Sequence, residues 1–399
     1  MKFAKRMSRL GTETAYAVAA DAAAYAEKGN KVYAFHLGDI NISTPPNIVA
    51  ACKKYLDEGK TGYCPAAGIK PLREAMAAEI NRTHGTDYTW ENVSIQSGGK
   101  PIIGKFLMTV MEEGDEVLYP SPGYPIYESQ VDFFGGVRKP YIYKEDDKGF
   151  SMDMDHFKSL ISPRTVAFVY NNYQNPMGVC SSPEEMKELA ELAVKNDWIV
   201  LSDEAYFDLV YEGQPQSIVS LPGMKERTVI LYTFSKKYSM TGWRLGAAIG
   251  PKEVIDKINK INTNDEACTT HFIQWAGIEA LKGDLAYCDK LVETLKERRD
   301  VCIETLVDCP GIRVHVPKAT FYLFVNVTEA MVKMGITKYE EFRLHMLEKT
   351  GVSFCTREHF GAVLPGETDK YIRFAYSGIE VPQIREGLTK FKEYIKTYF

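Results

Sequence analysis

Helix-like and strand-like segments follow one another regularly between residues 45 and 235. Short, continuous apolar runs of β-branched and aromatic residues indicate strands that are buried on both faces. The pattern predicts helices at 47–57, 71–80, 101–111 and 183–194, and strands at 93–96, 116–119, 165–170, 198–201 and 228–234. Such strands, separated by helices, are typical of a parallel sheet with helices on both faces.

The pattern changes on either side of this region. An Ala-rich stretch, 14–28, predicts a helix that stops at Gly29, and an apolar run at 32–37 predicts a strand. After a long helical region around Trp275, the pattern predicts strands at 313–316, 321–327 and 371–376, a helix at 339–349 and an amphipathic helix at 381–394. We therefore expect an α/β protein whose large domain spans 45–275 and whose smaller α+β domain combines 1–44 with 276–399.

Composition narrows the class of protein. The 399 residues are 45% hydrophobic and 25% charged, with 48 Lys and Arg against 53 Asp and Glu, and the charges are interspersed. A net charge of -5 argues against a nucleic-acid binder, and no apolar run reaches the roughly 18 residues that span a bilayer. The eight cysteines and seven histidines are scattered without zinc-binding spacing. We expect a cytoplasmic protein with reduced thiols, no metal site and no membrane partner.

The segment 233–246 contains the first candidate chemistry. A strand ends at Ser235 and Lys236, and Arg244 follows between two glycines, Gly242 and Gly246. Open α/β sheets bind ligands at the carboxyl ends of their strands. A lysine there can form a Schiff base with a carbonyl cofactor, and an arginine suits bidentate phosphate binding, although both could equally be surface residues.

This segment resembles the lysine motif of the class I/II aminotransferases, the aspartate aminotransferase superfamily of fold type I. The resemblance implies that Lys236 carries pyridoxal 5'-phosphate and that Ser235 and Arg244 hold its phosphate. It selects Lys236 over Lys237, which we interpret as a solvent-facing or phosphate-rim residue. Thr233 departs from the usual Gly or Ser three residues before the lysine.

Further motifs occur in the order that the family has them. Asp203, after a buried strand, could be a helix cap, but Tyr206 three residues later matches the family's Asp-x-x-Tyr. The resemblance implies that Asp203 keeps the cofactor's pyridine nitrogen protonated and that Tyr206 binds its ring oxygen. Asn175, in an Asn-Pro turn, is implied as a second donor to that oxygen, although Tyr173 and Met177 replace the usual Pro and Thr.

A glycine turn that opens a helix provides a candidate phosphate site at Gly98, Gly99 and Lys100. Backbone N–H groups and the positive end of a helix attract anions. By resemblance, Tyr63 lies in the family's Tyr-x-Pro-x-x-Gly segment and completes the phosphate site of a neighbouring subunit. The active unit would then be a homodimer with shared sites.

Three residues are implied for the remaining contacts. Tyr124 lies where the family has an aromatic residue stacked on the pyridine ring, although it could instead be a core aromatic. Arg373, on an otherwise apolar strand, would be costly to bury without a partner, and a substrate α-carboxylate is a fitting one. Gly38 aligns with the loop that touches the same carboxylate.

These motifs predict an aminotransferase that moves an amino group from an L-amino acid to a 2-oxo acid by a ping-pong mechanism. Aspartate is the favoured donor and 2-oxoglutarate the favoured acceptor, because Lys100 stands where a branch of the family binds a side-chain carboxylate; Lys100 could instead cap the loop or pair with the phosphate. Against an acidic-only specificity, Glu13 and Ala15 stand near where that branch has small hydroxyl residues. Tyr16 and Tyr124 could instead admit an aromatic side chain, and Arg357 could supply or block a second carboxylate contact. The alternatives are an aromatic or broad-range aminotransferase, a carbon–sulfur lyase of the same fold, and a non-enzymatic regulator.

Overall fold

A seven-stranded sheet forms the centre of the computed structural model, which describes residues 1–11 and 14–399. Its strand order is β2-β10-β9-β8-β7-β3-β4, and only β10 runs antiparallel to its neighbours. The strands are β2 (Val93–Gln96), β3 (Glu116–Pro120), β4 (Val137–Tyr141), β7 (Thr165–Tyr170), β8 (Ile199–Asp203), β9 (Thr228–Thr233) and β10 (Gly246–Ile249). The fold is α/β with a mostly parallel sheet, as the sequence predicts.

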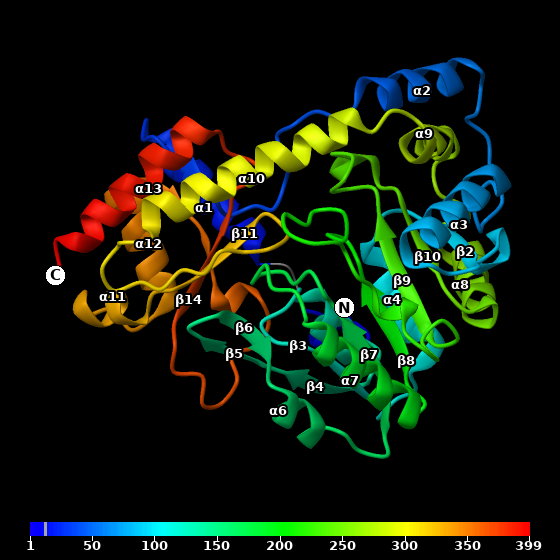
Figure 1. Ribbon diagram of the computed structural model, residues 1–399, viewed down its shortest axis with the longest axis horizontal. Coiled ribbons are helices and arrows are strands. Elements are labelled where there is room, and N and C mark those ends of the chain that lie inside the picture. Colours follow the sequence, from blue (N-terminus) through cyan, green and yellow to red (C-terminus); the bar gives the residue numbers. More distant parts are fainter. Residues whose placement is uncertain (12–13) are drawn as a thin grey trace.

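Helices cover both faces of this sheet (Figure 1). Alternate residues point to opposite sides of a strand, so Leu201 and Val229 pack on one face while Val200 and Ile230 pack on the other. The helices of this part of the chain are α2 (Pro46–Asp57), α3 (Lys70–His84), α4 (Lys100–Val110), α5 (Ile126–Phe133), α6 (Met154–Ser159), α7 (Pro183–Lys195), α8 (Lys252–Asp265) and α9 (His271–Lys282). A hairpin of β5 (Tyr143–Asp146) and β6 (Gly149–Met152) follows the edge strand.

A second core lies between the C-terminal helices and a small sheet, at the left of Figure 1. The sheet has the order β11-β14-β13, with β11 (Tyr322–Asn326) and β14 (Tyr371–Ala375) antiparallel. The other elements are β12 (Val352–Ser353), β13 (Cys355–Thr356), α10 (Ala286–Leu306), α11 (Thr328–Lys333), α12 (Tyr339–Thr350) and α13 (Val381–Lys396). Ile372 and Phe374 of β14 pack in the same cluster as Leu388 and Phe391 of α13.

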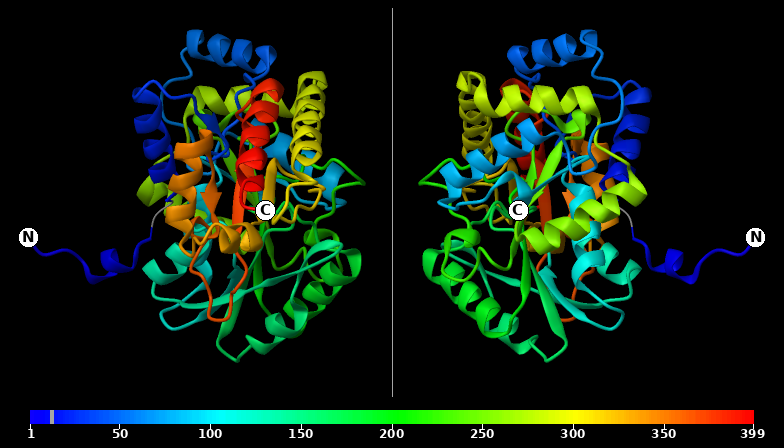
Figure 2. Two further views of the ribbon diagram at one scale, coloured as in Figure 1. Left: turned by 90° about the vertical axis from the view of Figure 1, so that its left-hand side faces the viewer. Right: turned by 90° about the vertical axis from the view of Figure 1, so that its right-hand side faces the viewer.

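The N-terminal residues join this second part in space. Helix α1 (Ala15–Glu27) places Ala15 and Val18 against Cys355 and Phe360, and β1 (Tyr33–Ala34) pairs with β12. Figure 2 shows residues 1–11, with the short 3-10 helix η1 (Lys5–Arg9), projecting away from the body. The domain boundaries near residues 45 and 275 stay a prediction.

Two element predictions need correction. Residues 313–316 form no strand, because Arg313 pairs with Asn326 only as an isolated bridge. The side chains of Arg313 and His315 bind Glu145 of the β5–β6 hairpin. The run 32–37 is a strand only at Tyr33 and Ala34, since β12 offers just two residues to pair with. Within the described residues, no helix is both long and apolar enough to cross a membrane.

Candidate active site

The polar segments of the predicted site meet at one edge of the seven-stranded sheet. Strands β2, β7, β8 and β9 are parallel and end there, so the residues that follow them are brought together. Gly246, which begins the antiparallel strand β10, pairs with Gln96 and with Thr233 at the ends of β2 and β9. The segment between β9 and β10 therefore leaves and re-enters the sheet at the same edge, and it carries both Lys236 and Arg244.

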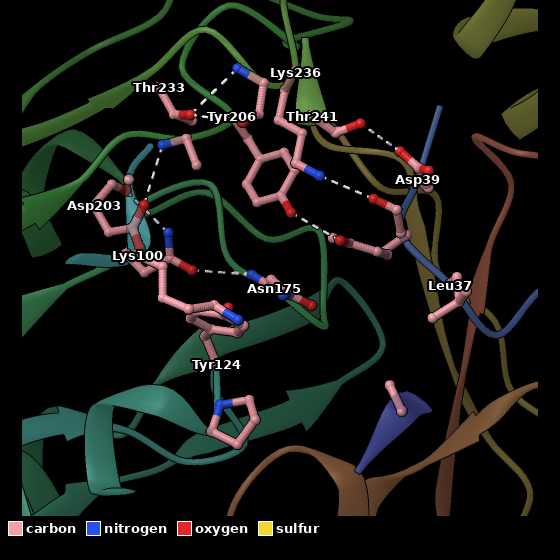
Figure 3. Close-up of a pocket in the computed structure, with 18 of the residues that line it drawn as sticks. Leu37, Asp39, Lys100, Tyr124, Asn175, Asp203, Tyr206, Thr233, Lys236 and Thr241 are labelled. Atoms are coloured by element: carbon pink, nitrogen blue, oxygen red, sulfur yellow. Dashed lines mark hydrogen bonds between the residues drawn. The ribbon is translucent and has the colours of Figure 1, made fainter. Parts of the chain in front are cut away.

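A cavity of about 600 Å³ opens at this edge. This volume falls in the range of small-molecule sites. Almost all of the predicted site residues line it, namely Gly38, Gly99, Lys100, Tyr124, Asn175, Asp203, Tyr206, Ser235, Lys236, Arg244 and Arg373. Gly98 lies in the loop beside the cavity, and Tyr63 lies elsewhere. Figure 3 shows Lys236, Tyr206 and Asp203 around this cavity, with Leu37 and Asp39 on the opposite wall.

The Lys236 amine reaches across the cavity to the N-terminal segment. Its Nζ donates a hydrogen bond of 2.9 Å to the carbonyl oxygen of Gly38 and lies 5.2 Å from the ring centre of Phe321. Lys237 points elsewhere: its Nζ is 2.8 Å from Asp208 and 3.5 Å from Glu79. Our interpretation of Lys237 as a solvent or phosphate-rim residue is wrong, because its side chain forms a largely buried ion pair behind the site.

Asp203 ends β8, and its buried side chain lies on the wall of the cavity. Its Oδ2 accepts a 2.6 Å hydrogen bond from the phenol of Tyr127, and its Oδ1 accepts one of 3.1 Å from the backbone N–H of Ala205. Burial raises the pKa of Asp203, and the Tyr127 hydrogen bond opposes this rise only in part. A cation placed against this carboxylate would favour its ionised form. Tyr127 was not predicted from the sequence; its position three residues after Tyr124 at the start of α5 was the available signal.

A pair of phenols lies beside Lys236. The Tyr206 and Tyr322 hydroxyls are 2.7 Å apart, and burial raises the pKa of Tyr206 well above its ordinary value, so Tyr206 stays neutral and able to donate. Tyr322 comes from β11 of the second part and was also not predicted. A Cβ on Gly38 would lie 2.3 Å from the Tyr322 hydroxyl, so a larger residue there would displace the Tyr322 side chain.

The loop after β2, with Gly98 and Gly99, lies against Arg244, the arginine before β10. We call this region, together with Ser235, the phosphate cradle. Gly98 has a φ of +94°, and a Cβ there would lie 2.2 Å from Nη2 of Arg244. Gly99 is the residue before α4, so this region lies at the positive N-terminal end of that helix, which attracts an anion. Pro101 has no N–H, and the N–H of Ile102 donates to the Gly99 carbonyl oxygen at 3.1 Å. Ser235 lines the same region, with its Oγ accepting from Thr233 at 2.9 Å.

Arg373 is buried at the far side of the cavity. Its Nη1 donates to Oδ1 of Asn175 at 3.0 Å and its Nη2 donates to the carbonyl of His36 at 2.9 Å. Its guanidinium lies between the rings of Tyr322 and Phe360, at 4.3 and 4.6 Å. The Nε–H has no hydrogen-bond partner among the described residues. No carboxylate of those residues pairs with Arg373, so a buried cation is left for an anionic ligand.

The rim of the cavity contains the residues considered for substrate selection. The Lys100 ammonium lies 5.7 Å from the ring centre of Tyr124, and Ala15 and Tyr16 also line the wall. Arg357 is instead directed away: its Nε and Nη2 donate to the two oxygens of the Glu367 carboxylate, and Nη2 also donates to the Ser121 hydroxyl. Glu13 lies outside the described residues.

Tyr63 stands apart from these groups. Its side chain is 90% exposed in the loop between α2 and α3. An aromatic residue presented to solvent in this way does not contribute to the cavity of its own chain.

Comparison with known proteins gives the family. The model for aminotransferase class I and II matches residues 32–391. The chain is 34% identical over 395 residues to a probable aspartate/prephenate aminotransferase of Aquifex aeolicus, covering 98% of each, and 32% identical to an aspartate aminotransferase of Geobacillus stearothermophilus, covering 91% and 92%.

Solved structures agree in fold. An aspartate aminotransferase from Thermus thermophilus with maleate superposes with a TM-score of 0.90 at 29% identity, covering 98% of this chain and 99% of that one. An aromatic aminotransferase from Pyrococcus horikoshii has a TM-score of 0.85 at 27% identity, covering 94% and 99%. Members of the family generally depend on pyridoxal phosphate. The chain belongs to the class I and II aminotransferases, has their fold type I architecture and is an aminotransferase.

Proposed function

We propose that the cavity binds pyridoxal 5'-phosphate and exchanges amino groups between L-aspartate and 2-oxoglutarate. The observation that carries the proposal is the convergence of an amine, a buried carboxylate and a buried guanidinium, those of Lys236, Asp203 and Arg373, on one cavity. Each has a different chemical task, and together they match the aldehyde, the pyridine nitrogen and the substrate carboxylate.

The residues present fit the cofactor. The glycine at 98 leaves the cradle open where a Cβ would collide with Arg244, and Gly98, Gly99, Ser235 and Arg244 would hold the phosphate. Lys236 would anchor the aldehyde and Tyr124 would cover the ring. Tyr206 and Asn175 would donate to the ring oxygen, and Asp203 would hold the protonated ring nitrogen.

Bound there, the cofactor would supply an electron sink for the carbanion at the substrate Cα. The negative charge of Asp203 would stabilise positive charge on the ring nitrogen. Lys236 Nζ would take the proton from the substrate Cα and deliver it to the C4′ carbon of the cofactor, since it is the amine held inside the cavity. Arg373 would fix the α-carboxylate, and the lack of any carboxylate partner for its buried guanidinium among the described residues supports that role.

Two observations support an acidic amino donor. The Lys100 ammonium lies on the cavity wall, where it could meet a side-chain carboxylate, and Arg357 is already bound to Glu367 and cannot serve. The similar proteins from Geobacillus and Thermus bear the name aspartate aminotransferase. An aromatic or broad-range donor is the second candidate, because Tyr16 and Tyr124 also line this wall.

The exposed Tyr63 supports a homodimer in which each chain completes the other's phosphate site. This assembly and a cytoplasmic location are part of the proposal.

A donor panel tests the function. The full-length protein, supplied with pyridoxal phosphate, is incubated with single amino acids and 2-oxoglutarate, and each product is quantified. We expect aspartate to yield glutamate and oxaloacetate in equal amounts, with parallel double-reciprocal plots. Release of ammonia or a thiol without the acceptor would favour the lyase, and a preference for aromatic donors would favour the second candidate.

A further inference from the structure

A buried lysine lies on α4, one and a half turns from the phosphate cradle. Lys105 is 2% exposed, and its Nζ donates to Oε1 of Glu266 at 2.6 Å, to Oδ1 of Asn262 at 2.7 Å and to Oε1 of Gln96 at 3.2 Å. Asp265 lies farther away, at 3.8 Å. All three protons of the ammonium therefore have partners, and none of these contacts belongs to the wall of the cavity.

The partners of Lys105 connect it to the cradle. The Ser97 hydroxyl donates to the other oxygen of the Glu266 carboxylate, and Ser97 immediately precedes Gly98. Gln96, the last residue of β2, donates to Ser94 at 2.8 Å. The ion pair thus holds the two residues that lead into the glycine turn.

The same network reaches the loop that carries Tyr63. Nδ2 of Asn262 donates to the carbonyl oxygen of Ala66 at 3.1 Å. One cluster between α4 and α8 therefore fixes both segments that we assign to phosphate binding, one for this chain and one for its partner.

Stability alone does not explain this cluster. Replacing a buried ion pair by apolar residues is often neutral or stabilising, since desolvation of two charges offsets their attraction. Such a pair instead fixes the local conformation, because each of its hydrogen bonds holds the partner group in one position. Burial opposes ionisation of Glu266, but its bonds to Lys105 and Ser97 keep its pKa below the ordinary value, so the carboxylate remains a charged acceptor for Ser97.

We propose that Lys105 and Glu266 are positioning residues that hold the turn at Ser97, Gly98 and Gly99 in the conformation that accepts the cofactor's phosphate. The inference rests on the proposed function, in that the cavity binds pyridoxal phosphate. It concerns the phosphate end of the site, so loss of the pair should weaken binding of the phosphorylated cofactor and leave binding of pyridoxal itself unchanged.

The test uses full-length protein freed of cofactor and titrated with pyridoxal phosphate or with pyridoxal, followed by absorbance. Glu266→Gln and Lys105→Met should each raise the Kd for pyridoxal phosphate at least tenfold, with less than a twofold change for pyridoxal. Ser97→Ala, which leaves the ion pair intact and removes only its link to the turn, should raise the Kd for pyridoxal phosphate at least threefold.

Glu116→Gln is the matched control. Glu116 is another buried carboxylate, bound by Arg164 at 2.8 Å and by the Ser162 hydroxyl at 2.6 Å. It is the first residue of β3, so it lies at the amino ends of the parallel strands, away from the cavity. It should lower the melting temperature without changing either Kd.

The outcomes separate the two proposals. If wild type binds pyridoxal phosphate and Glu266→Gln and Ser97→Ala bind it within twofold of wild type, the inference is wrong and the function stands. Equal losses of affinity for pyridoxal phosphate and for pyridoxal would also contradict the inference, since they would indicate that the whole site is disturbed and not its phosphate end alone. If wild type binds no pyridoxal phosphate, both proposals fail.

Discussion

Asp203 is buried, and among the described residues its carboxylate accepts hydrogen bonds from the Tyr127 phenol and the Ala205 N–H only. A cationic ring nitrogen would supply the missing charge. We predict that Asp203→Asn still binds the cofactor but turns over at least about a hundredfold more slowly, about 2.7 kcal/mol of lost transition-state stabilisation. Single-turnover kinetics with aspartate, alongside the bound-cofactor content, measure this. A rate close to wild type would mean that Asp203 only caps the turn at Ala205.

The role that we propose for Lys100 is to select the amino donor. If its ammonium binds a side-chain carboxylate, Lys100→Ala should lose aspartate and glutamate selectively, by about 1.5–3 kcal/mol for a charged hydrogen bond. Aromatic donors should change little. Comparing kcat/KM across the donor panel measures the difference, and an equal loss for all donors would place Lys100 at the cofactor instead.

The sequence predicted the residues that carry a motif and missed those that only support them. The motif residues Asn175, Asp203 and Lys236 gather on the cavity because each lies at or just after the end of a strand that finishes at the same edge. Arg373 reaches the cavity from β14 of the small sheet. Tyr127 and Tyr322 belong to no short motif and come from elements far apart in the chain, so only the folded backbone brings them to Asp203 and Tyr206. Lys237 was misinterpreted because its partners, Asp208 and Glu79, cannot be identified from local sequence.

The pattern of hydrophobic residues was sufficient to predict the elements that are long or wholly apolar. Strands such as β7 and β9 and the amphipathic helix α13 have a pattern of their own. The antiparallel strand β10, only four residues long, was not predicted, because its small residues resemble a glycine-rich loop. Its direction is what returns Arg244 to the edge where Lys236 lies.

The end of α3 is tied to β8 by a buried ion pair. His84 Nε2 lies 2.6 Å from Oε2 of Glu204, and although burial disfavours the charged imidazole, Glu204 raises the pKa of His84 overall. A raised folded-state pKa gives stability that is fully present below the unfolded value of about 6.5 and is lost as the pH rises through the folded value.

His84→Gln should therefore destabilise the protein most at pH 6, by about 1.5–3 kcal/mol, and less at pH 9. Denaturant unfolding at both pH values measures the difference. His345→Gln is the control, because that ring contacts the Tyr394 phenol rather than a carboxylate. A His84→Gln effect that is the same at both pH values would contradict a charged imidazole.

In the whole molecule, we predict that the two subunits of a homodimer share their active sites. Tyr63→Phe and Lys236→Ala homodimers should both be weak or inactive, but hybrids formed by subunit exchange should contain one site with both residues intact. Mixing the two variants should therefore restore activity, up to about a quarter of wild type when mixing is random, because half of the dimers are hybrids with one intact site. An active monomer at assay concentration, shown by sedimentation, would contradict the arrangement.

Lys236 is the residue that we expect to carry the cofactor. Borohydride reduction of the protein with bound pyridoxal phosphate, followed by peptide mass mapping, locates the attachment directly. The account predicts a pyridoxyl phosphate adduct on Lys236 and no such adduct on Lys237, whose ammonium is held by Asp208 and Glu79. An adduct on Lys237 or on another lysine, with Lys236 unmodified, would contradict it.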